Sequence, residues 1–354
     1  MSSKISKKNK AKYSCAGSRK SDKPCLGYRY RAYPTDEQVL YFANVFGCCR
    51  FLWNRYVDDE SYFYKVMGAS LGSTPADYKE DYPFLAEVDS YALCNVQLHF
   101  QKAMKAFFAG NAEYPKFKKK YKCRNSYTTN YCKGNIVLCG DGIRLPKLPG
   151  GTLKLALHRR PPENAKLKSV TVMRGPDGAY YVSVLYEVEA TATPKLLDPE
   201  NVRAIGLDMS LPDFYVASDG STAPCMKYFR ESEEKLAWEQ HKLSRMVKGS
   251  KNYERQKQRA AKVYAKVKHQ RRDMLQKLST WLVRNYDVIC IEDLNMHAMA
   301  QMMNWGKTVN DNGWGMFVEL LEQKCARAGK YLVRVDRWFP SSQTCSCCGI
   351  RTRR

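Results

Sequence analysis

No stretch of this sequence is apolar over enough residues to cross a bilayer. The first twelve residues are polar and basic, and they contain no apolar segment of the kind that a secretory signal requires. We therefore expect neither a membrane-spanning helix nor a secretory signal. Fourteen cysteines would stay reduced in a cytosol, so we expect no disulfide framework and expect most of them to pack in apolar surroundings.

Acidic residues are in short supply relative to basic ones. Asp and Glu total 35 against 59 Lys and Arg, which gives a formal net charge of +24. An excess of positive charge of this size repels itself unless a polyanion offsets it. A protein gains affinity for nucleic acid from every phosphate that one of its lysines or arginines neutralises. Because the basic residues recur along the whole length, we favour a nucleic-acid partner over a merely basic protein that binds membranes or ribosomes.

The first half of the chain predicts a strand, a helical region and then a set of short strands. A capping box at Thr35 and Gln38 follows an alternating stretch that ends at Pro34 and precedes a helical pattern. A second helix is predicted over residues 90–108, and a hairpin turn at the P-D-G sequence of residues 176–178. The expected boundaries are a disordered basic tail at 1–27, a linker at 193–201, and between them a β-rich part at 28–35 and 110–192 with a helical insert at 36–109.

The second half begins with a new pattern of apolar strands and amphipathic helices. Strands are predicted at 202–208, 214–218, 288–291 and 331–335, a charged helical pair at 231–285, and a helix at 316–327. Asp208 directly follows the apolar AIGL sequence, and Glu292 directly follows VICI. Carboxylates at the ends of strands project into the crevice where α/β sheets bind ligands. Such a pair can bind Mg²⁺, and two ions about 4 Å apart would support phosphodiester cleavage.

Several motifs resemble, in their order, those of the TnpB family, the RuvC-type proteins of small bacterial insertion sequences and relatives of type V CRISPR effectors. The matching segments are YRAYPTDEQ with FGCCRFLWN (30–54), YPKFKKK (114–120), AIGLDMSLPDFYVASDG (204–220), VICIEDLNM (288–296), NDNGWGMF (310–317) and FPSSQTCSCCG (339–349). They span nearly all of residues 28–349. Any one of them is a weak signal, but the ordered set is highly specific.

This resemblance implies a multidomain α+β protein. It would combine a small β-barrel wedge domain carrying a helical recognition insert with an α/β RNase H-like (RuvC) nuclease domain at 202–338. The nuclease domain would contain the helical insertion 231–285 and be followed by a partial zinc ribbon at 339–354. The implied function is a transposon-encoded, RNA-guided DNA endonuclease with Asp208 and Glu292 as catalytic, Mg²⁺-binding acids. Its implied partners are a guide RNA from the transposon end and a double-stranded target DNA beside a short adjacent motif, bound by a monomeric protein in the bacterial cytoplasm, at the nucleoid.

The resemblance also assigns nucleic-acid-binding and zinc-binding residues. Its basic segment lies against the target duplex, and the residues assigned to it here are Lys116, Phe117, Lys118, Lys119 and Lys120; the alternative is a plain solvated basic strand. Cys345 and Cys348 have the C-x-x-C spacing of half a structural zinc site, which needs four ligands. The second C-x-x-C and the third RuvC carboxylate have no matching residue, since neither Asp311 nor Asp336 stands in the corresponding place. We therefore expect the sequence to be trimmed at its C-terminus, and expect this chain to bind RNA and DNA but to cut weakly or not at all.

Three alternatives stay open. A nuclease-inactive, RNA-guided DNA-binding repressor of the same ancestry fits the missing third acid but not the intact Asp208 and Glu292. A transposase could use a similar fold, although the five histidines form no H-x-H pair. Motif order alone does not exclude a small type V CRISPR effector.

Overall fold

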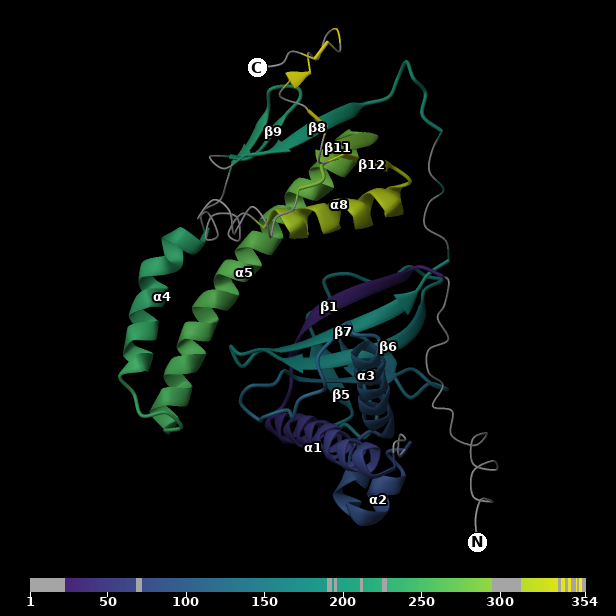
Figure 1. The fold of residues 1–354 in the computed structure, drawn as a ribbon, viewed down its shortest axis with the longest axis vertical. Coiled ribbons are helices and arrows are strands. Elements are labelled where there is room, and N and C mark those ends of the chain that lie inside the picture. Colours follow the sequence, from purple (N-terminus) through teal and green to yellow (C-terminus); the bar gives the residue numbers. More distant parts are fainter. Residues whose placement is uncertain are drawn as a thin grey trace. The chain divides into compact units, whose positions relative to one another are not determined.

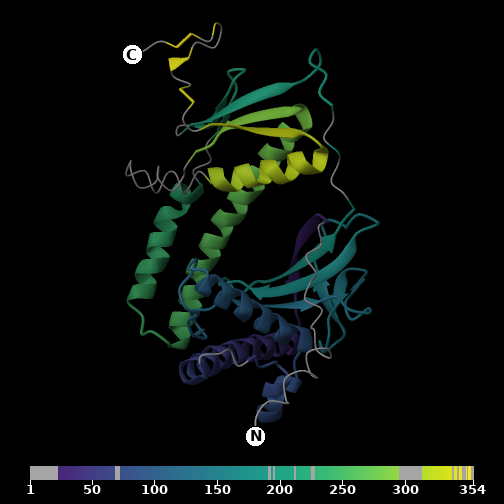
Figure 2. The same cartoon turned by 45° about the vertical axis from the view of Figure 1, so that its right-hand side comes forward.

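The computed structural model describes residues 23–67, 72–189, 193, 196–210, 213–224, 228–294 and 313–336, and near the C-terminus residues 339, 340, 343, 344, 348, 350 and 351. The chain divides into two compact units, Met1–Glu189 and Ala190–Arg354, whose elements are drawn in Figures 1 and 2. Each unit has its own sheet, its own helices and its own apolar core.

The first unit is built on a seven-stranded antiparallel sheet in the order β2-β6-β7-β1-β5-β4-β3. The strands are β1 (Cys25–Tyr33), β2 (Asn125–Asn130), β3 (Val137–Cys139), β4 (Gly142–Arg144), β5 (Thr152–Leu155), β6 (Lys166–Arg174) and β7 (Tyr180–Glu187). The long strand β1 lies at the centre, between β7 and β5. The sheet curls but ends at β2 and β3, so the small β-barrel that the resemblance implies is a half-barrel here. Closure needs both edges to pair, and β3 and β4 have three residues each.

Two long helices pack against this sheet. They are α1 (Asp36–Met67) and α3 (Ser90–Phe108), joined through α2 (Asp77–Asp81) and the short 3₁₀ helix η1 (Pro83–Ala86). The predicted capping box is present: the Thr35 amide donates to Gln38 Oε1, and the Gln38 amide donates to Thr35 Oγ1, each at 3.3 Å. The buried Gln38 side chain also donates to the carbonyls of Pro149 and Thr152, which fastens the start of α1 to β5.

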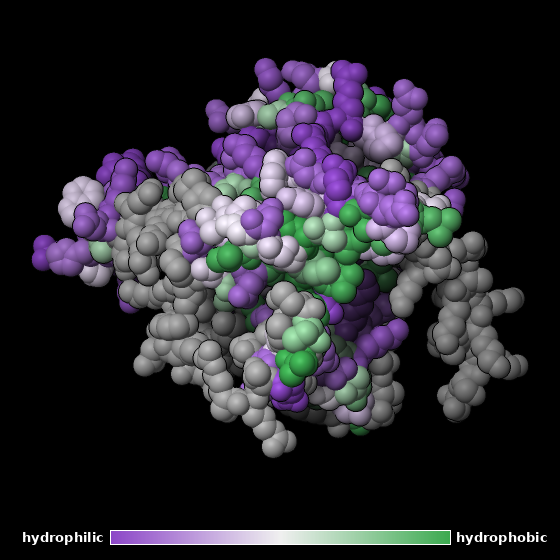
Figure 3. Space-filling view, turned by 90° about the horizontal axis from the view of Figure 1, so that it is seen from above, coloured by the Kyte–Doolittle hydropathy of each residue, from purple (hydrophilic) through white to green (hydrophobic). Residues whose placement is uncertain are grey.

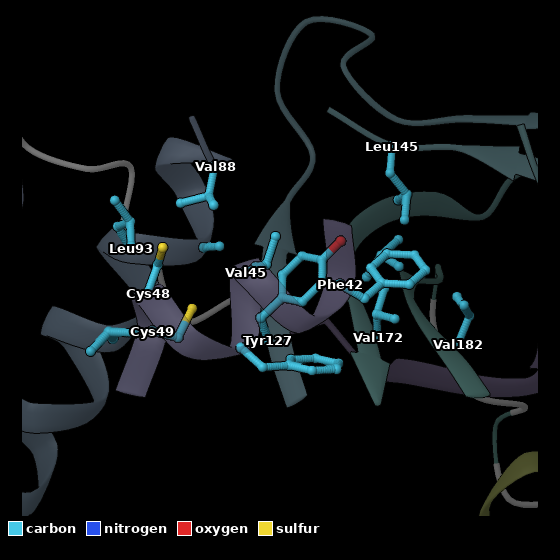
Figure 4. Close-up of a cluster of buried hydrophobic side chains, with 14 of the residues drawn as sticks. Phe42, Val45, Cys48, Cys49, Val88, Leu93, Tyr127, Leu145, Val172 and Val182 are labelled. Atoms are coloured by element: carbon cyan, nitrogen blue, oxygen red, sulfur yellow. The ribbon is translucent and has the colours of Figure 1, made fainter. Parts of the chain in front are cut away.

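The core of the first unit lies between α1, α3 and the sheet (Figure 4). The Phe42 ring of α1 lies 6.2 Å from Tyr127 of β2 and 5.7 Å from Tyr180 of β7. Figure 4 shows Cys48 and Cys49 on the α1 side of this core, near Leu93 of α3. No disulfide bond joins the cysteines that the structure describes.

The second unit has a five-stranded sheet in the order β10-β9-β8-β11-β12. The strands are β8 (Ala204–Met209), β9 (Asp213–Ala217), β10 (Thr222–Pro224), β11 (Val288–Glu292) and β12 (Tyr331–Val335). Strands β8, β11 and β12 run parallel to one another, whereas β9 is antiparallel to both β8 and β10. The parallel strands are joined through helices: α4 (Tyr228–Ser244) and α5 (Lys251–Asn285) lie between β10 and β11 in the chain, and α8 (Trp314–Ala328) precedes β12.

Helices α5 and α8 lie on the same face of this sheet (Figures 1 and 2). The apolar faces of both helices are buried there: Leu275 and Leu282 of α5, with Phe317 and Leu321 of α8, are fully inaccessible to solvent. They pack on strand residues such as Ile205 and join the sheet and the two helices in one core. The charged hairpin of α4 and α5 is held by a buried pair in which Gln256 Nε2 donates to the Glu239 backbone carbonyl and to its carboxylate.

Sequence patterns located most of these elements but missed three short strands, β2, β4 and β10. Strand β1 begins at Cys25, so residues 25–27 of the predicted tail belong to the sheet, and residues 1–22 lie outside the described part. In the residues described, no helix is both long enough and apolar enough to cross a membrane. On the face drawn in Figure 3, hydrophilic side chains surround a smaller hydrophobic area.

Candidate metal centre and nucleic-acid interface

Asp208 and Glu292 come from neighbouring parallel strands at the same level of the sheet. Leu207 of β8 is the register partner of Ile291 of β11, and each acid is the next residue along its strand. Adjacent strands lie about 4.8 Å apart, so the two carboxylate-bearing backbone positions are immediate neighbours. The pairing register, which the sequence does not state, brings the two predicted acids together.

The two acids lie on the sheet face opposite α5 and α8. Leu207 and Ile291 are 3% and 2% exposed because they point into the core, and successive side chains of a strand point to opposite faces. Asp208 is accordingly exposed, and Glu292 is half-buried. The same face carries Val216 of β9, beside Asp208 in the register, with 40% of its surface exposed.

The acid that follows Glu292, Asp293, contacts strand β12. Asp293 accepts a hydrogen bond from Arg334 of β12 at 3.4 Å, and Arg334 also forms an ion pair with Glu322 of α8. Asp293 thus takes part in a surface ion-pair network that links β12 and α8.

The pair supplies two carboxylate side chains. Carboxylate oxygens on an accessible sheet face suit Mg²⁺, which keeps several of its waters when proteins bind it. Among the residues that the structure describes, no group of three or more His, Cys, Asp or Glu side chains could hold a metal ion. Asp336 is exposed just beyond β12, and Asp311 lies outside the described residues.

The predicted basic segment follows α3 as an irregular loop. Lys116, Phe117, Lys119 and Lys120 are exposed, and the Phe117 ring has 55% of its surface accessible. Lys116 forms an ion pair with Glu113. Four of the five predicted residues therefore present charge or an aromatic ring to solvent.

Lys118 differs from its neighbours because it turns inward. Its Nζ lies 3.5 Å from the centre of the Trp53 ring, in a cation–π contact, and burial lowers the pKa of its ammonium group. Sequence reasoning gave no role to Trp53 or to Asn54, which also contacts this loop. A tryptophan and an asparagine near the middle of a long helix give no sequence signal for a distant backbone partner.

The cysteine pair lies at the C-terminal end of the chain. Cys345 lies outside the described residues, and Cys348 is exposed. Thr344 and Arg351, which flank both cysteines, form an antiparallel bridge, and Arg351 donates to Gln343 Oε1. The residues that flank the two cysteines are therefore paired with each other.

Comparison with protein families gives three matches along the chain. Residues 183–303 match the OrfB profile of IS605-type elements, described as "Probable transposase". Residues 26–66 match a helix-turn-helix domain of the same OrfB proteins, and residues 314–354 match a Cas12f1-like TNB domain. All three agree with the motif order found in the sequence.

Individual relatives are similar over most of their length. A Streptomyces pristinaespiralis protein named "Putative RNA-guided DNA endonuclease" is 33% identical over 329 residues, covering 91% of this chain and 80% of that protein. InsQ of Escherichia coli K12, named "Putative RNA-guided DNA endonuclease InsQ", is 26% identical over 346 residues, covering 91% of this chain and 83% of InsQ.

A solved structure shares the fold. Cas12f1, in its complex with a single guide RNA and target DNA, aligns with a TM-score of 0.52 and 13% identity, over 89% of this chain and 76% of Cas12f1. The predicted resemblance is thus confirmed by sequence and by fold. This chain belongs to the TnpB family, the OrfB proteins of IS605-type transposable elements.

Proposed function

We propose that this chain is a transposon-encoded, RNA-guided DNA endonuclease whose nuclease centre contains Asp208 and Glu292. One observation carries the assignment of the centre: in the parallel register of β8 and β11 the two acids are neighbours on the sheet face opposite α5 and α8. A sheet of this order, with β9 antiparallel beside three parallel strands, supports the RNase H-like (RuvC) fold expected for the second unit.

Mg²⁺ fits the donor set at this centre. Asp208 and Glu292 offer hard carboxylate oxygens, and the half-buried position of Glu292 limits its freedom to turn away. When bound, Mg²⁺ would stabilise negative charge on the phosphate and acidify a bound water. The chain itself contributes the two fixed carboxylates, and the core beneath them holds their strands in register.

Guide RNA and target DNA are the proposed partners. A net charge of +24 supplies the phosphate affinity, and Lys116, Phe117, Lys119 and Lys120 form one exposed contact surface for the target duplex. Choice of target sequence would come from base pairing with the guide, as in other RNA-guided systems. The protein would act as a monomer.

We also propose a structural zinc ion at Cys345 and Cys348. Two thiolates in the segment between the paired residues Thr344 and Arg351 would provide half of the four ligands that such an ion takes, so the site needs two further donors. The ion would hold this segment in place.

A nuclease-inactive, RNA-guided binding protein is the second candidate. It is favoured by the lack of a three-ligand metal cluster among the described residues. The neighbouring positions of Asp208 and Glu292 on paired strands favour the nuclease.

Retargeting the guide tests the RNA-guided function. The chain would be purified with RNA carrying either of two guide sequences and given a plasmid that contains both target sites, with Mg²⁺. We expect the cut or the bound site to move with the guide. Cutting that ignores the guide would refute RNA guidance, and guided binding without cutting would favour the second candidate.

A further inference from the structure

The basic loop is irregular, yet helix α1 holds its backbone at three points. Asn54 Nδ2 donates to the Lys118 carbonyl at 3.1 Å, and the Lys118 amide donates to Asn54 Oδ1 at 2.7 Å. The indole Nε1 of Trp53 donates to the Lys116 carbonyl at 3.0 Å. Two consecutive helical residues therefore satisfy the backbone groups that a strand partner would otherwise satisfy.

Lys118 and Trp53 form the buried side of this contact. The Trp53 ring is 8% exposed and packs edge-on against Phe100 of α3, with ring centres 5.7 Å apart. Lys118 covers the ring, and its half-buried ammonium group remains within the protein surface. Lys118 thus anchors the loop, whereas the side chains on either side of it face outward.

The outward side of the loop has the chemistry of a nucleic-acid contact. Phe117 presents an aromatic ring that can stack on a base or a sugar, and the lysines beyond Lys118 can reach phosphates. The carbonyl of Lys119 accepts hydrogen bonds from the Lys122 and Cys123 amides, which closes the loop with a turn. Ordering a free loop on binding costs conformational entropy, so a loop already ordered by the protein binds with less entropic loss.

We propose that Trp53 and Asn54 are positioning residues that hold the basic loop in its DNA-binding shape, with Lys118 acting through Trp53 and with Phe117, Lys119 and Lys120 making the contacts. This inference rests on the proposed binding of target DNA by the loop. It adds a division of roles within a run of residues that look alike in the sequence.

The test measures target-DNA affinity of the full chain with its guide RNA over a series of KCl concentrations. Asn54→Ala removes no charge, but it releases the loop. We expect it to weaken DNA binding about tenfold. The negative slope of log K against log[salt] should become shallower by about 0.9 for each phosphate that the loop no longer neutralises. Lys119→Ala should make the slope shallower by about 0.9, because it removes one phosphate-binding charge directly. Asn44→Ala is the matched control: Asn44 is exposed on the same helix and bonds to the Glu87 side chain, away from the loop.

The outcomes separate this inference from the function on which it rests. If Lys119→Ala and Phe117→Ala weaken binding but Asn54→Ala leaves affinity and slope unchanged, the loop binds DNA and the positioning role is wrong. If Lys119→Ala and Phe117→Ala both bind like the wild type, the proposed DNA contact is itself wrong. If Asn54→Ala weakens binding without changing the slope, it acts on general stability, and the positioning role is again wrong.

A second variant covers the case in which Asn54→Ala does not fold. Asn54→Asp keeps the size of the side chain and the acceptor for the Lys118 amide, but it removes the donor to the Lys118 carbonyl. We expect its thermal midpoint to stay near that of the wild type while trypsin cleaves more rapidly after Lys119 and Lys120. Cleavage at the wild-type rate would contradict the proposal.

Discussion

Shortening Phe317 to alanine should destabilise the second unit by about 3–5 kcal/mol, the usual cost of emptying a buried phenylalanine site. The Phe317 ring is fully inaccessible, and its centre lies 5.0 Å from Phe214, 5.4 Å from Trp314 and 6.3 Å from Tyr215. Each favourable aromatic pair contributes about 0.5–1.5 kcal/mol beyond its buried area, which supports the upper part of the range. Tyr215 lies on β9, which pairs with the strand that carries Asp208. The loss of packing at Phe317 should therefore also affect the acid pair.

Hydrogen exchange read by mass spectrometry suits this prediction because it reports the second unit separately. Amides of β8 and β11 that open with the core should exchange at least about a hundredfold faster in Phe317→Ala. Phe317→Leu keeps most of the volume and should cost less. Met316→Ala is the surface control, since Met316 is 37% exposed and should change stability by no more than about 0.5 kcal/mol. Equal exchange in Phe317→Ala and Met316→Ala would refute this account of the core.

Three further predictions concern single polar groups. Lys324→Met should destabilise the second unit by about 1–3 kcal/mol, because the Lys324 ammonium donates to three oxygens of α5 at 2.7 Å each. Urea unfolding measures this loss, with Gln323→Met at an exposed position as the control. Cys49 should resist a thiol reagent at pH 8 while the exposed Cys25 reacts, because burial raises the pKa of Cys49 to about 12 and leaves about one thiolate in ten thousand. Asp287→Asn should lower the thermal midpoint at pH 7 but not at pH 2. Burial raises the pKa of Asp287, but hydrogen bonds and ion pairs with Arg203 and Lys330 lower it more, so the net pKa lies below the usual value.

The sign of the pH effect follows from proton linkage. A carboxylate whose pKa is lowered by folding stabilises the native state above its unfolded pKa, about 3.9, and loses that contribution as the pH falls through the folded value. Convergence of wild type and Asp287→Asn in acid is therefore expected, and a constant difference down to pH 2 would contradict it. Rapid labelling of Cys49, or equal stability of Lys324→Met and Gln323→Met, would contradict the other two predictions.

The local features of this fold could be predicted from the sequence. The capping box at Thr35 and Gln38 lies within four residues and is visible in the letters themselves. The stripe that includes Leu275 and Leu282 follows helical spacing, so its buried face could be predicted. Asp208 and Glu292 were found because each interrupts an apolar strand pattern.

Non-local features could not be predicted in the same way. The side-by-side placement of Asp208 and Glu292 depends on the register between two strands more than eighty residues apart in sequence, which no local pattern encodes. Strand β2, with the sequence NSYTTN, has little apolar alternation and exists because it pairs with β6. Lys118 looks like its lysine neighbours until the fold brings Trp53 beneath it.

The measurement that tests the central claim most directly is guide-dependent cleavage of a target plasmid in Mg²⁺ by the wild type, Asp208→Ala and Glu292→Ala, with target binding measured in parallel. The acid pair predicts cutting by the wild type, even if slow, that falls by at least about a hundredfold in either variant, while target affinity stays near the wild-type value. Cutting at the wild-type rate by either variant would contradict the role of that acid. Guided binding by the wild type with no cutting would contradict the nuclease centre and support an RNA-guided binding protein.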